Sequence, residues 1–176
     1  MKINLDNIKN NKLIHLTNKS YIINNTVFVG VCGWWNYNVG KEYIDDYFKN
    51  WIDFNKNETQ IFHSNVHIKS LIEYYYLVEE LNKFQNNINI DNIVIVTHTL
   101  PHRRYCKELV PNGKEKSFSD LLNTNFETIN KKNYSKITHW IFGHIHNEYN
   151  EIVMEFILYV IIVGELKIII ELNIKL

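Results

Sequence analysis

Two apolar runs that each end in histidine constrain the fold of this chain more than any other feature. Residues 93–97 read Ile-Val-Ile-Val-Thr and are followed by His98, and residues 137–142 read Ile-Thr-His-Trp-Ile-Phe and are followed by Gly143 and His144. Runs of β-branched and aromatic residues of this length are typical of buried strands. Because open α/β sheets hold ligands beyond the carboxyl ends of their strands, the pattern predicts histidines gathered at one edge of a sheet.

The chain upstream of the first run predicts a hairpin followed by a helix. Residues 20–23 and 26–32 favour strands, and Asn24-Asn25 between them suits a tight turn because Asn tolerates positive φ. Over residues 63–84 apolar side chains recur at helical spacing, namely Val66, Leu71, Ile72, Tyr75, Leu77, Val78 and Leu81. We therefore expect an α/β fold in which this helix covers a sheet with 93–97 and 137–142 as neighbouring strands.

Weaker patterns occur elsewhere in the chain. Residues 12–16 favour a further strand, and residues 44–52 and 118–123 favour short helices. Residues 151–176 favour one or two strands, but this segment contains no Pro and is rich in Ile and Leu. We expect this C-terminal tail to be poorly packed, with exposed apolar surface.

Length and charge exclude several classes of protein. The 176 residues suit one domain that spans residues 1–176 and buries roughly 70% of its unfolded surface. The 19 basic and 19 acidic side chains cancel, which predicts no nucleic-acid patch and no attraction to an anionic membrane. The most apolar stretch, residues 156–164, is shorter than the about 20 residues that span a bilayer, and the N-terminus lacks the pattern of a signal peptide. We expect a cytoplasmic protein without a membrane segment.

The two cysteines do not indicate a metal site or a disulfide. Cys32 and Cys106 lie far apart and outside any C-x-x-C pair. Reduced, buried thiols are the expected state of both. Imidazole, by contrast, is a common ligand for Zn, Mn, Fe and Ni, and Gly143 is expected to permit a tight turn at the end of the second strand.

Both histidine-terminated runs match motifs of one family. Residues 96–101 read V-T-H-T-L-P and residues 143–146 read G-H-I-H, and the segment from 16 to 35 contains a hairpin that ends in Gly-Trp-Trp. In these elements, in this order, residues 13–147 resemble the calcineurin-like metallophosphoesterase superfamily. The resemblance implies a metal-dependent phosphoesterase that hydrolyses phosphomonoesters or phosphodiesters.

The resemblance also implies roles for particular residues. His98 and His144 would bind one divalent metal ion and His146 a second, and Mn, Fe, Zn and Ni are not distinguished. Arg103 and Arg104 follow the first ligand loop and are candidate substrate-binding residues, because Arg binds phosphate in a bidentate manner. A polar loop without contact to substrate is the alternative for these two arginines.

Other motifs of the family are absent from these 176 residues. The sequence contains no D-x-H, no G-D-x-x-D and no G-N-H-D/E, which supply the bridging Asp, an Asn ligand and the histidine that assists the leaving group. No catalytic residue is therefore identified. The resemblance implies a partial metallophosphoesterase-type β-sandwich flanked by helices, lacking the N-terminal half, with residues 151–176 as an atypical tail.

Three interpretations remain open at this stage. The first is an enzyme whose missing motifs lie on an upstream segment or on a separate N-terminal-half chain. The second is a catalytically inactive fragment or scaffold remnant. The third is a mononuclear hydrolase of another fold, which would need a carboxylate ligand that we do not identify. His63 and His67 form an i, i+4 pair but are most simply a solvated helix surface, and Trp34 and Trp35 suit either a substrate cleft or packing at a sheet edge.

Overall fold

The computed structural model describes residues 14–36, 59–103, 122–144, 150–153 and 156–160, and it describes no side chains for 59–64 or 150–160. Its elements, in chain order, are β1 (Lys19–Ile23), β2 (Thr26–Gly30), α2 (Thr59–Gln85), β3 (Asn92–Val96), the short 3-10 helix η4 (Thr124–Thr128), β4 (Ile137–Phe142), β5 (Asn150–Val153) and β6 (Phe156–Val160).

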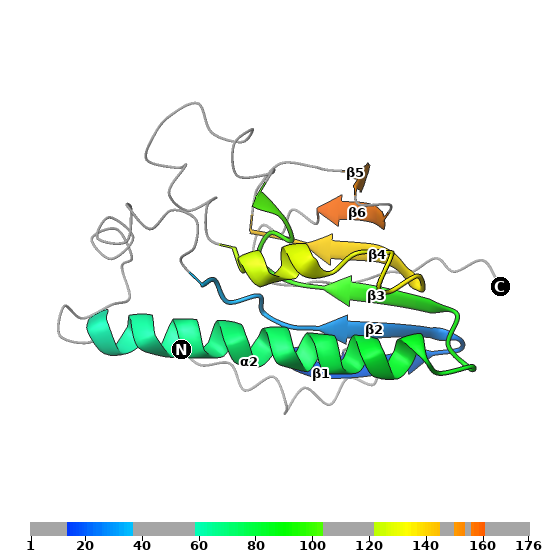
Figure 1. Cartoon of the computed structure of the whole chain (residues 1–176), viewed down its shortest axis with the longest axis horizontal. Helices are drawn as coiled ribbons and strands as arrows, with labels where there is room; N and C mark the ends of the chain where they lie inside the picture. The colour runs from blue at the N-terminus through cyan, green and yellow to red at the C-terminus, as the bar shows by residue number, and fades with distance from the viewer. Residues whose placement is uncertain (1–13, 37–58, 104–121, 145–149, 154–155, 161–176) are drawn as a thin grey trace.

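The strands form one mixed sheet in the order β1-β2-β3-β4-β6-β5 (Figure 1). Strands β2, β3, β4 and β6 run parallel, and the hairpin partners β1 and β5 are antiparallel to β2 and β6. The predicted α/β class is confirmed, as is the prediction that 93–97 and 137–142 form neighbouring strands. Within the described residues all strands belong to this sheet, so the two-sheet sandwich stays a prediction.

The β1–β2 hairpin turns where Asn24-Asn25 was expected to allow it. Asn24 has a φ of 54°, and Ile23 pairs with Thr26 across the turn. The predicted strand at 12–16 is wrong over its described part, because residues 14–16 are not in a strand and Thr17 makes a single bridge to Gly30. Gly30 permits this close approach because it has no side chain. A Cβ at this position would collide with Leu16.

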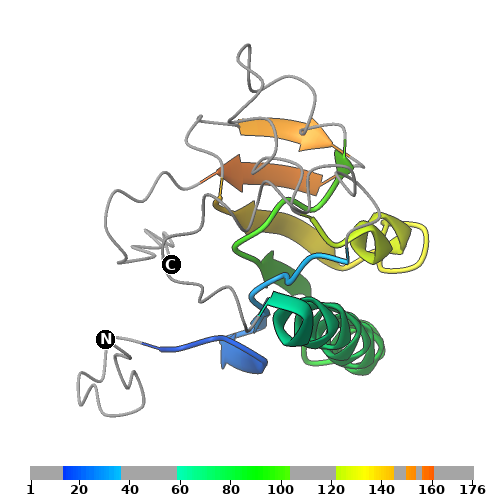
Figure 2. The same cartoon turned by 90° about the vertical axis from the view of Figure 1, so that its left-hand side faces the viewer.

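Helix α2 covers one face of the sheet over β2 and β3, and η4 lies on the same side (Figure 2). The helix begins at Thr59, earlier than predicted. The positions buried against the sheet are Val66, Ser70, Glu73, Leu77, Leu81 and Phe84. The predicted apolar face is wrong at Ile72 and Tyr75, which are 56% and 64% exposed. The sheet-facing stripe contains the polar residues Ser70 and Glu73, so the spacing of apolar residues alone does not identify it.

Both faces of the central strands are apolar. Val27, Ile93, Ile95, Trp140 and Phe142 belong to the main core that packs beneath α2. The alternate residues Phe28, Val94, Val96 and Ile141 form a smaller cluster, each between 5% and 8% exposed. Continuous apolar runs of this kind are expected of parallel strands covered on both faces, and each buried large side chain contributes about 1.5–3 kcal/mol.

The remaining predictions fall partly outside the described residues. The predicted helix at 44–52 lies outside them. Of the predicted helix at 118–123, residues 122 and 123 are described and precede η4, where the Asn123 side chain caps the helix by accepting a hydrogen bond from the Asn125 amide at 3.2 Å. Within 151–176, β5 and β6 extend the sheet, but their side chains are not described, so the expected poor packing stays a prediction. In the described part of the chain, no helix has the length and apolar character needed to cross a bilayer.

Candidate metal centre

The loops that leave β2, β3 and β4 meet at one edge of the sheet, because these strands are parallel. The backbone amide of His98 donates to the carbonyl of Cys32 at 3.0 Å, after the end of β2. The carbonyl of His98 accepts a hydrogen bond from the amide of Gly143 at 3.0 Å, after the end of β4. The main chain of His98 is thereby fixed from both neighbouring strands.

His98 and His144 lie side by side at this edge, as the sequence predicted. Nδ1 of His144 is 3.4 Å from Nε2 of His98. The ring planes make an angle of 81°, and the ring centroids are 5.2 Å apart. His146, the third predicted ligand, lies outside the described residues.

The separation of the two nitrogens fits a shared metal ion. Two nitrogens bound at about 2.0–2.1 Å to one tetrahedral ion lie about 3.3–3.4 Å apart. A hydrogen bond between imidazoles is ordinarily shorter than the observed 3.4 Å. The pair therefore satisfies the spacing test for two ligands of one ion, and its role as a ligand pair stays a prediction.

The His98 imidazole is suited to the neutral form that binds metal. Desolvation by the surrounding protein lowers the pKa of His98 below its ordinary value, although the residue is exposed to solvent. A neutral imidazole offers a free lone pair, whereas the protonated form offers none.

The backbone at His144 has an uncommon conformation. Gly33 is the one described glycine with positive φ, so the tight turn expected at Gly143 does not use a left-handed glycine. His144 itself has a φ of 69°. A non-glycine residue in this region is strained, and such strain concentrates at functional sites.

Other potential ligands near the pair are otherwise engaged. Burial is the main cause that raises the pKa of the Cys32 thiol to about 12, which disfavours a thiolate ligand. Glu73 accepts hydrogen bonds from backbone amides. Within the residues that the structure describes, no group of three or more His, Cys, Asp or Glu side chains is arranged to hold a metal ion.

The sequence analysis did not predict that Glu73 and the side-chain amides of Asn36 and Asn123 are buried. Asn123 is fully buried, and its Nδ2 donates to the Ser70 carbonyl at 2.8 Å, while its Oδ1 accepts from Nδ2 of Asn36 at 3.3 Å. The available signal was the pair Ser70 and Glu73 on the sheet-facing stripe of α2. Polar side chains in such a stripe are buried only when they find hydrogen-bond partners.

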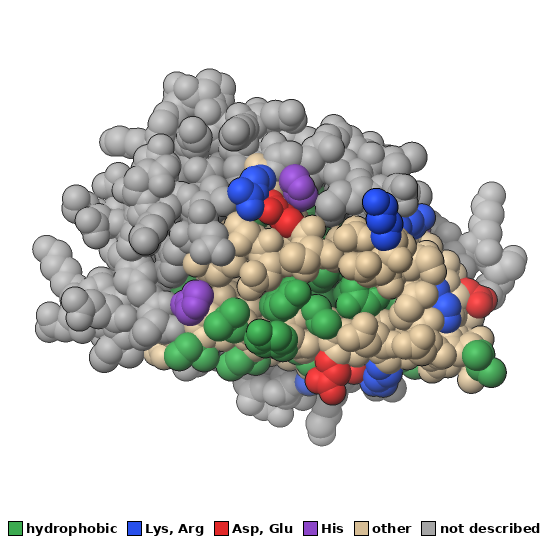
Figure 3. Space-filling view, in the orientation of Figure 1, with side chains coloured by type: hydrophobic (Ala, Val, Ile, Leu, Met, Phe, Trp, Pro, Cys, Tyr) green, Lys and Arg blue, Asp and Glu red, His purple; other side chains and the backbone are tan. Residues whose placement is uncertain are grey.

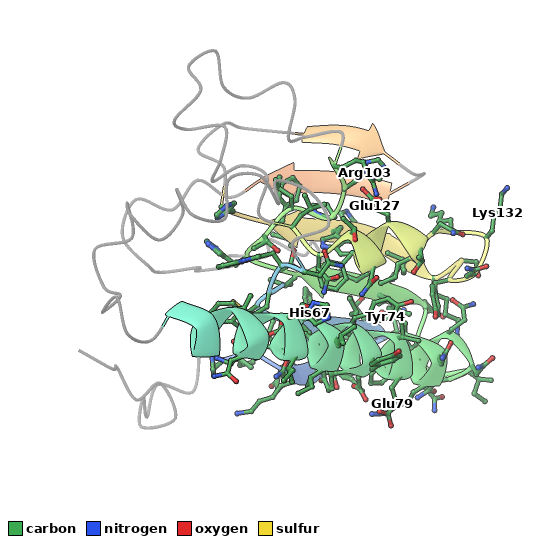
Figure 4. All side chains as sticks on the ribbon, turned by 60° about the vertical axis from the view of Figure 1, so that its left-hand side comes forward. His67, Tyr74, Glu79, Arg103, Glu127 and Lys132 are labelled. Carbon is green, nitrogen blue, oxygen red and sulfur yellow. The ribbon has the colours of Figure 1, made fainter. Side chains whose placement is uncertain are left out.

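Of the two candidate substrate-binding arginines, the structure describes Arg103. Arg103 makes a bidentate ion pair with Glu127 of η4, with Nε 2.9 Å from Oε1 and Nη2 2.7 Å from Oε2 (Figure 4). The backbone amide of Arg103 also donates to Glu127 at 2.8 Å. A phosphate ligand would have to share or displace this pair. Arg104 lies outside the described residues.

The structure also shows where Trp34, Trp35 and His67 lie. Trp35 is buried, and Trp34 is partly buried beneath the ammonium of Lys69, which lies 4.7 Å from its ring centroid. These contacts agree with packing at the sheet edge. His67 is exposed on α2, as the solvated-surface interpretation requires, and the His63 side chain is not described.

Comparison with known proteins adds no family. No family model, curated protein or solved structure matches this chain. Any statement about function therefore depends on the residues and their geometry.

Proposed function

We propose that this chain is the C-terminal portion of a calcineurin-like metallophosphoesterase, a metal-dependent hydrolase of phosphomonoesters or phosphodiesters. The observation that supports the proposal best is the 3.4 Å approach of the His98 and His144 ring nitrogens at the carboxyl ends of adjacent parallel strands. This is the place where α/β sheets bind their ligands. His98 and His144 belong to two motifs of the resemblance, V-T-H-x-x-P and G-H-x-H.

In this proposal His98 and His144 hold one divalent cation, and His146 contributes to a second. Mn, Fe, Zn or Ni would fit imidazole ligands, and such an ion would supply Lewis-acid stabilisation of charge on a phosphoryl oxygen. The task of the chain itself is to hold the two imidazoles in the correct orientation. The backbone bonds of His98 to Cys32 and Gly143 support that task.

The proposed architecture is a partial β-sandwich flanked by helices. The apolar cluster of Phe28, Val94, Val96 and Ile141, on the face of the sheet opposite α2, is the kind of surface that packs against a second sheet. We propose that an upstream segment or a separate N-terminal-half chain supplies the missing motifs. The phosphoester substrate would then bind where the two halves meet.

A catalytically inactive remnant is the second candidate. It is favoured by one observation, that the described residues place no carboxylate beside the histidine pair to join two cations. The two candidates agree on metal binding and differ on turnover.

Metal binding by the histidine pair tests the proposal. We expect the purified protein to bind Co²⁺ and Zn²⁺, measured by visible absorption and by calorimetry. His98→Ala and His144→Ala should each weaken binding by more than about 100-fold, since even substitutions beside a ligand cost 10- to 100-fold. The control is His67→Ala, which alters an exposed histidine on α2. Equal affinity in all four proteins would refute the proposed site.

A further inference from the structure

A buried glutamate on α2 binds the loop that follows β2. Glu73 is 3% exposed, and its Oε2 accepts hydrogen bonds from the amides of Gly33 at 2.7 Å and Trp34 at 2.8 Å. Its Oε1 accepts a third bond from the amide of Cys32 at 3.2 Å. Consecutive amides that converge on one anion form a nest, and the positive φ of Gly33, +83°, belongs to such a turn.

The same loop binds the main chain around His98. The carbonyl of Cys32 accepts hydrogen bonds from the amides of His98 at 3.0 Å and Thr99 at 3.4 Å. The carbonyl of Gly33 accepts a bond from the Thr99 hydroxyl. Two of the three residues whose amides contact Glu73, Cys32 and Gly33, therefore present their carbonyls to the turn that carries His98.

Contacts from β4 complete the support of this turn. The Trp140 indole donates to the Thr97 hydroxyl at 3.1 Å, and that hydroxyl donates to the Thr99 carbonyl at 2.8 Å. The His98 carbonyl accepts from Gly143, the residue before His144. An unbroken series of hydrogen bonds thus connects the α2 carboxylate to the backbone of His98 and to Gly143, the residue before His144.

The loop depends on this carboxylate because its amides have no partner in the sheet ladder. Strand β2 ends at Gly30, and Val31 makes the last bond to β3. Burial raises the pKa of the Glu73 carboxyl, while the three amide bonds and the nearby Lys69 oppose that increase. Without an acceptor at this position, buried N–H groups would remain unsatisfied and the loop would rearrange.

We infer that Glu73 is a positioning residue for the histidine pair, acting through the Cys32–Trp34 loop to fix the backbone of His98. The functional importance of this positioning rests on the proposed function, in which the pair binds a metal ion. The geometric part of the inference, that Glu73 fixes the backbone of His98 and so supports the approach of its ring to His144, does not depend on it.

The metal-based test compares Glu73→Gln and Glu73→Ala with Glu79→Gln, which changes an exposed glutamate that points away from the sheet on the same helix (Figure 4). We expect Co²⁺ affinity, from titration with CoCl2, to fall by about 10- to 100-fold in Glu73→Ala. Glu73→Gln should lose less, because one amide oxygen can still accept from Gly33 and Trp34. Glu79→Gln should bind as the wild type does.

A second measurement separates positioning from general stability and needs no metal. In the wild type we expect a nuclear Overhauser effect between ring protons of His98 and His144, and we expect it to weaken in both Glu73 variants at a temperature where they are folded. A lowered melting temperature with an unchanged Overhauser effect and unchanged Co²⁺ affinity would overturn the inference. A wild type that binds no Co²⁺ would overturn the proposed function, while the Overhauser comparison would still decide the positioning role.

Amide hydrogen exchange in the wild type tests the inference even if neither Glu73 variant folds. The amides of Gly33 and Trp34 should exchange as slowly as the amide of His98, because one network protects all three. Rapid exchange at Gly33 and Trp34, with slow exchange at His98, would show that the carboxylate does not hold the loop and would overturn the inference.

Discussion

At the scale of single residues, His144 combines two properties that rarely coincide without a reason. It has a left-handed backbone, with φ at 69°, and its ring nitrogen lies 3.4 Å from His98. A glycine at this position would remove the backbone strain but would also remove the imidazole. Strained residues persist where the surrounding structure or a function requires them, and here the side chain is the candidate requirement.

The strain at His144 can be measured by substitution. We expect His144→Gly to be more stable than His144→Ala by about 1 kcal/mol in urea denaturation, because alanine keeps the unfavourable φ and glycine does not. His139, which lies within β4, is the control: there His139→Gly should be less stable than His139→Ala, since glycine weakens strands. The same order at both positions would contradict the assignment of strain to His144.

A second prediction at this scale concerns Cys32. Its pKa is raised to about 12 by burial first and by the charge of Glu73 second, with Lys69 opposing them. At pH 8 we expect this thiol to react with a disulfide reagent at least about 100-fold more slowly than free cysteine, because the thiolate is the reactive form. The measurement uses Cys106→Ser, so that Cys32 is the remaining thiol. Reaction at the rate of free cysteine would show that the thiol is not desolvated.

At the scale of elements, η4 is connected to two other parts of the structure. Glu127 forms the bidentate pair with Arg103, at the end of the segment that follows His98, and Nδ1 of His102 lies 4.0 Å from the same carboxylate. The Thr128 hydroxyl lies 3.1 Å from the hydroxyl of Tyr74 on α2.

In the space-filling view the described Lys and Arg side chains are dispersed over this face and gather in no broad basic patch (Figure 3).

The Arg103–Glu127 pair predicts a pH dependence of stability. Burial alone would raise the pKa of Glu127, but the hydrogen bonds and charge of Arg103 outweigh it, so the pKa is lowered. The pair therefore stabilises the fold above the ordinary Glu pKa of about 4.3, and this contribution is lost as the pH falls through the lowered value.

We expect Glu127→Gln to lose up to about 1 kcal/mol at pH 7 and to show a weaker loss of stability on acidification than the wild type. Urea denaturation at pH 7 and between pH 5 and 3 provides the comparison. Glu79→Gln, on the exposed side of α2, is the control. Parallel pH profiles for the wild type and Glu127→Gln would show that the pair contributes nothing measurable.

At the scale of the whole molecule, the parallel strands bring together the loops that carry the candidate site. Loops from three strands, β2, β3 and β4, meet at one edge, and α2 supports that edge through Glu73. The family resemblance implies further ligands and a leaving-group histidine, and the sequence contains none of the motifs that would supply them. On the proposed function, we expect missing groups, and not the placement of His98 and His144, to limit catalysis by this chain alone.

We expect the isolated chain to show little or no phosphoesterase activity. The missing leaving-group histidine alone would cost about 10²–10⁴-fold, the usual contribution of general acid catalysis. The assay is turnover of p-nitrophenyl phosphate and its bis-ester with added Mn²⁺, Ni²⁺ or Zn²⁺. Robust hydrolysis that disappears in His144→Ala would show that the chain builds a complete site from residues not identified here.

The local pattern of the sequence was sufficient to predict β3, β4, the turn at Asn24 and the existence of α2. These features depend on side-chain periodicity and on the conformational preference of individual residues, which neighbouring positions reveal. The approach of His98 to His144 was predictable for a related reason, because parallel neighbouring strands bring their carboxyl ends to the same edge.

Only the tertiary structure decided which residues of α2 face the sheet, that Glu73 binds the loop after β2, and that Arg103 pairs with Glu127. These contacts join residues 24 to 41 positions apart. Whether a charged side chain is buried depends on the partners that it meets, and the partners come from other elements. The left-handed backbone of His144 was likewise not evident from the sequence, because positive φ is uncommon for a residue other than glycine.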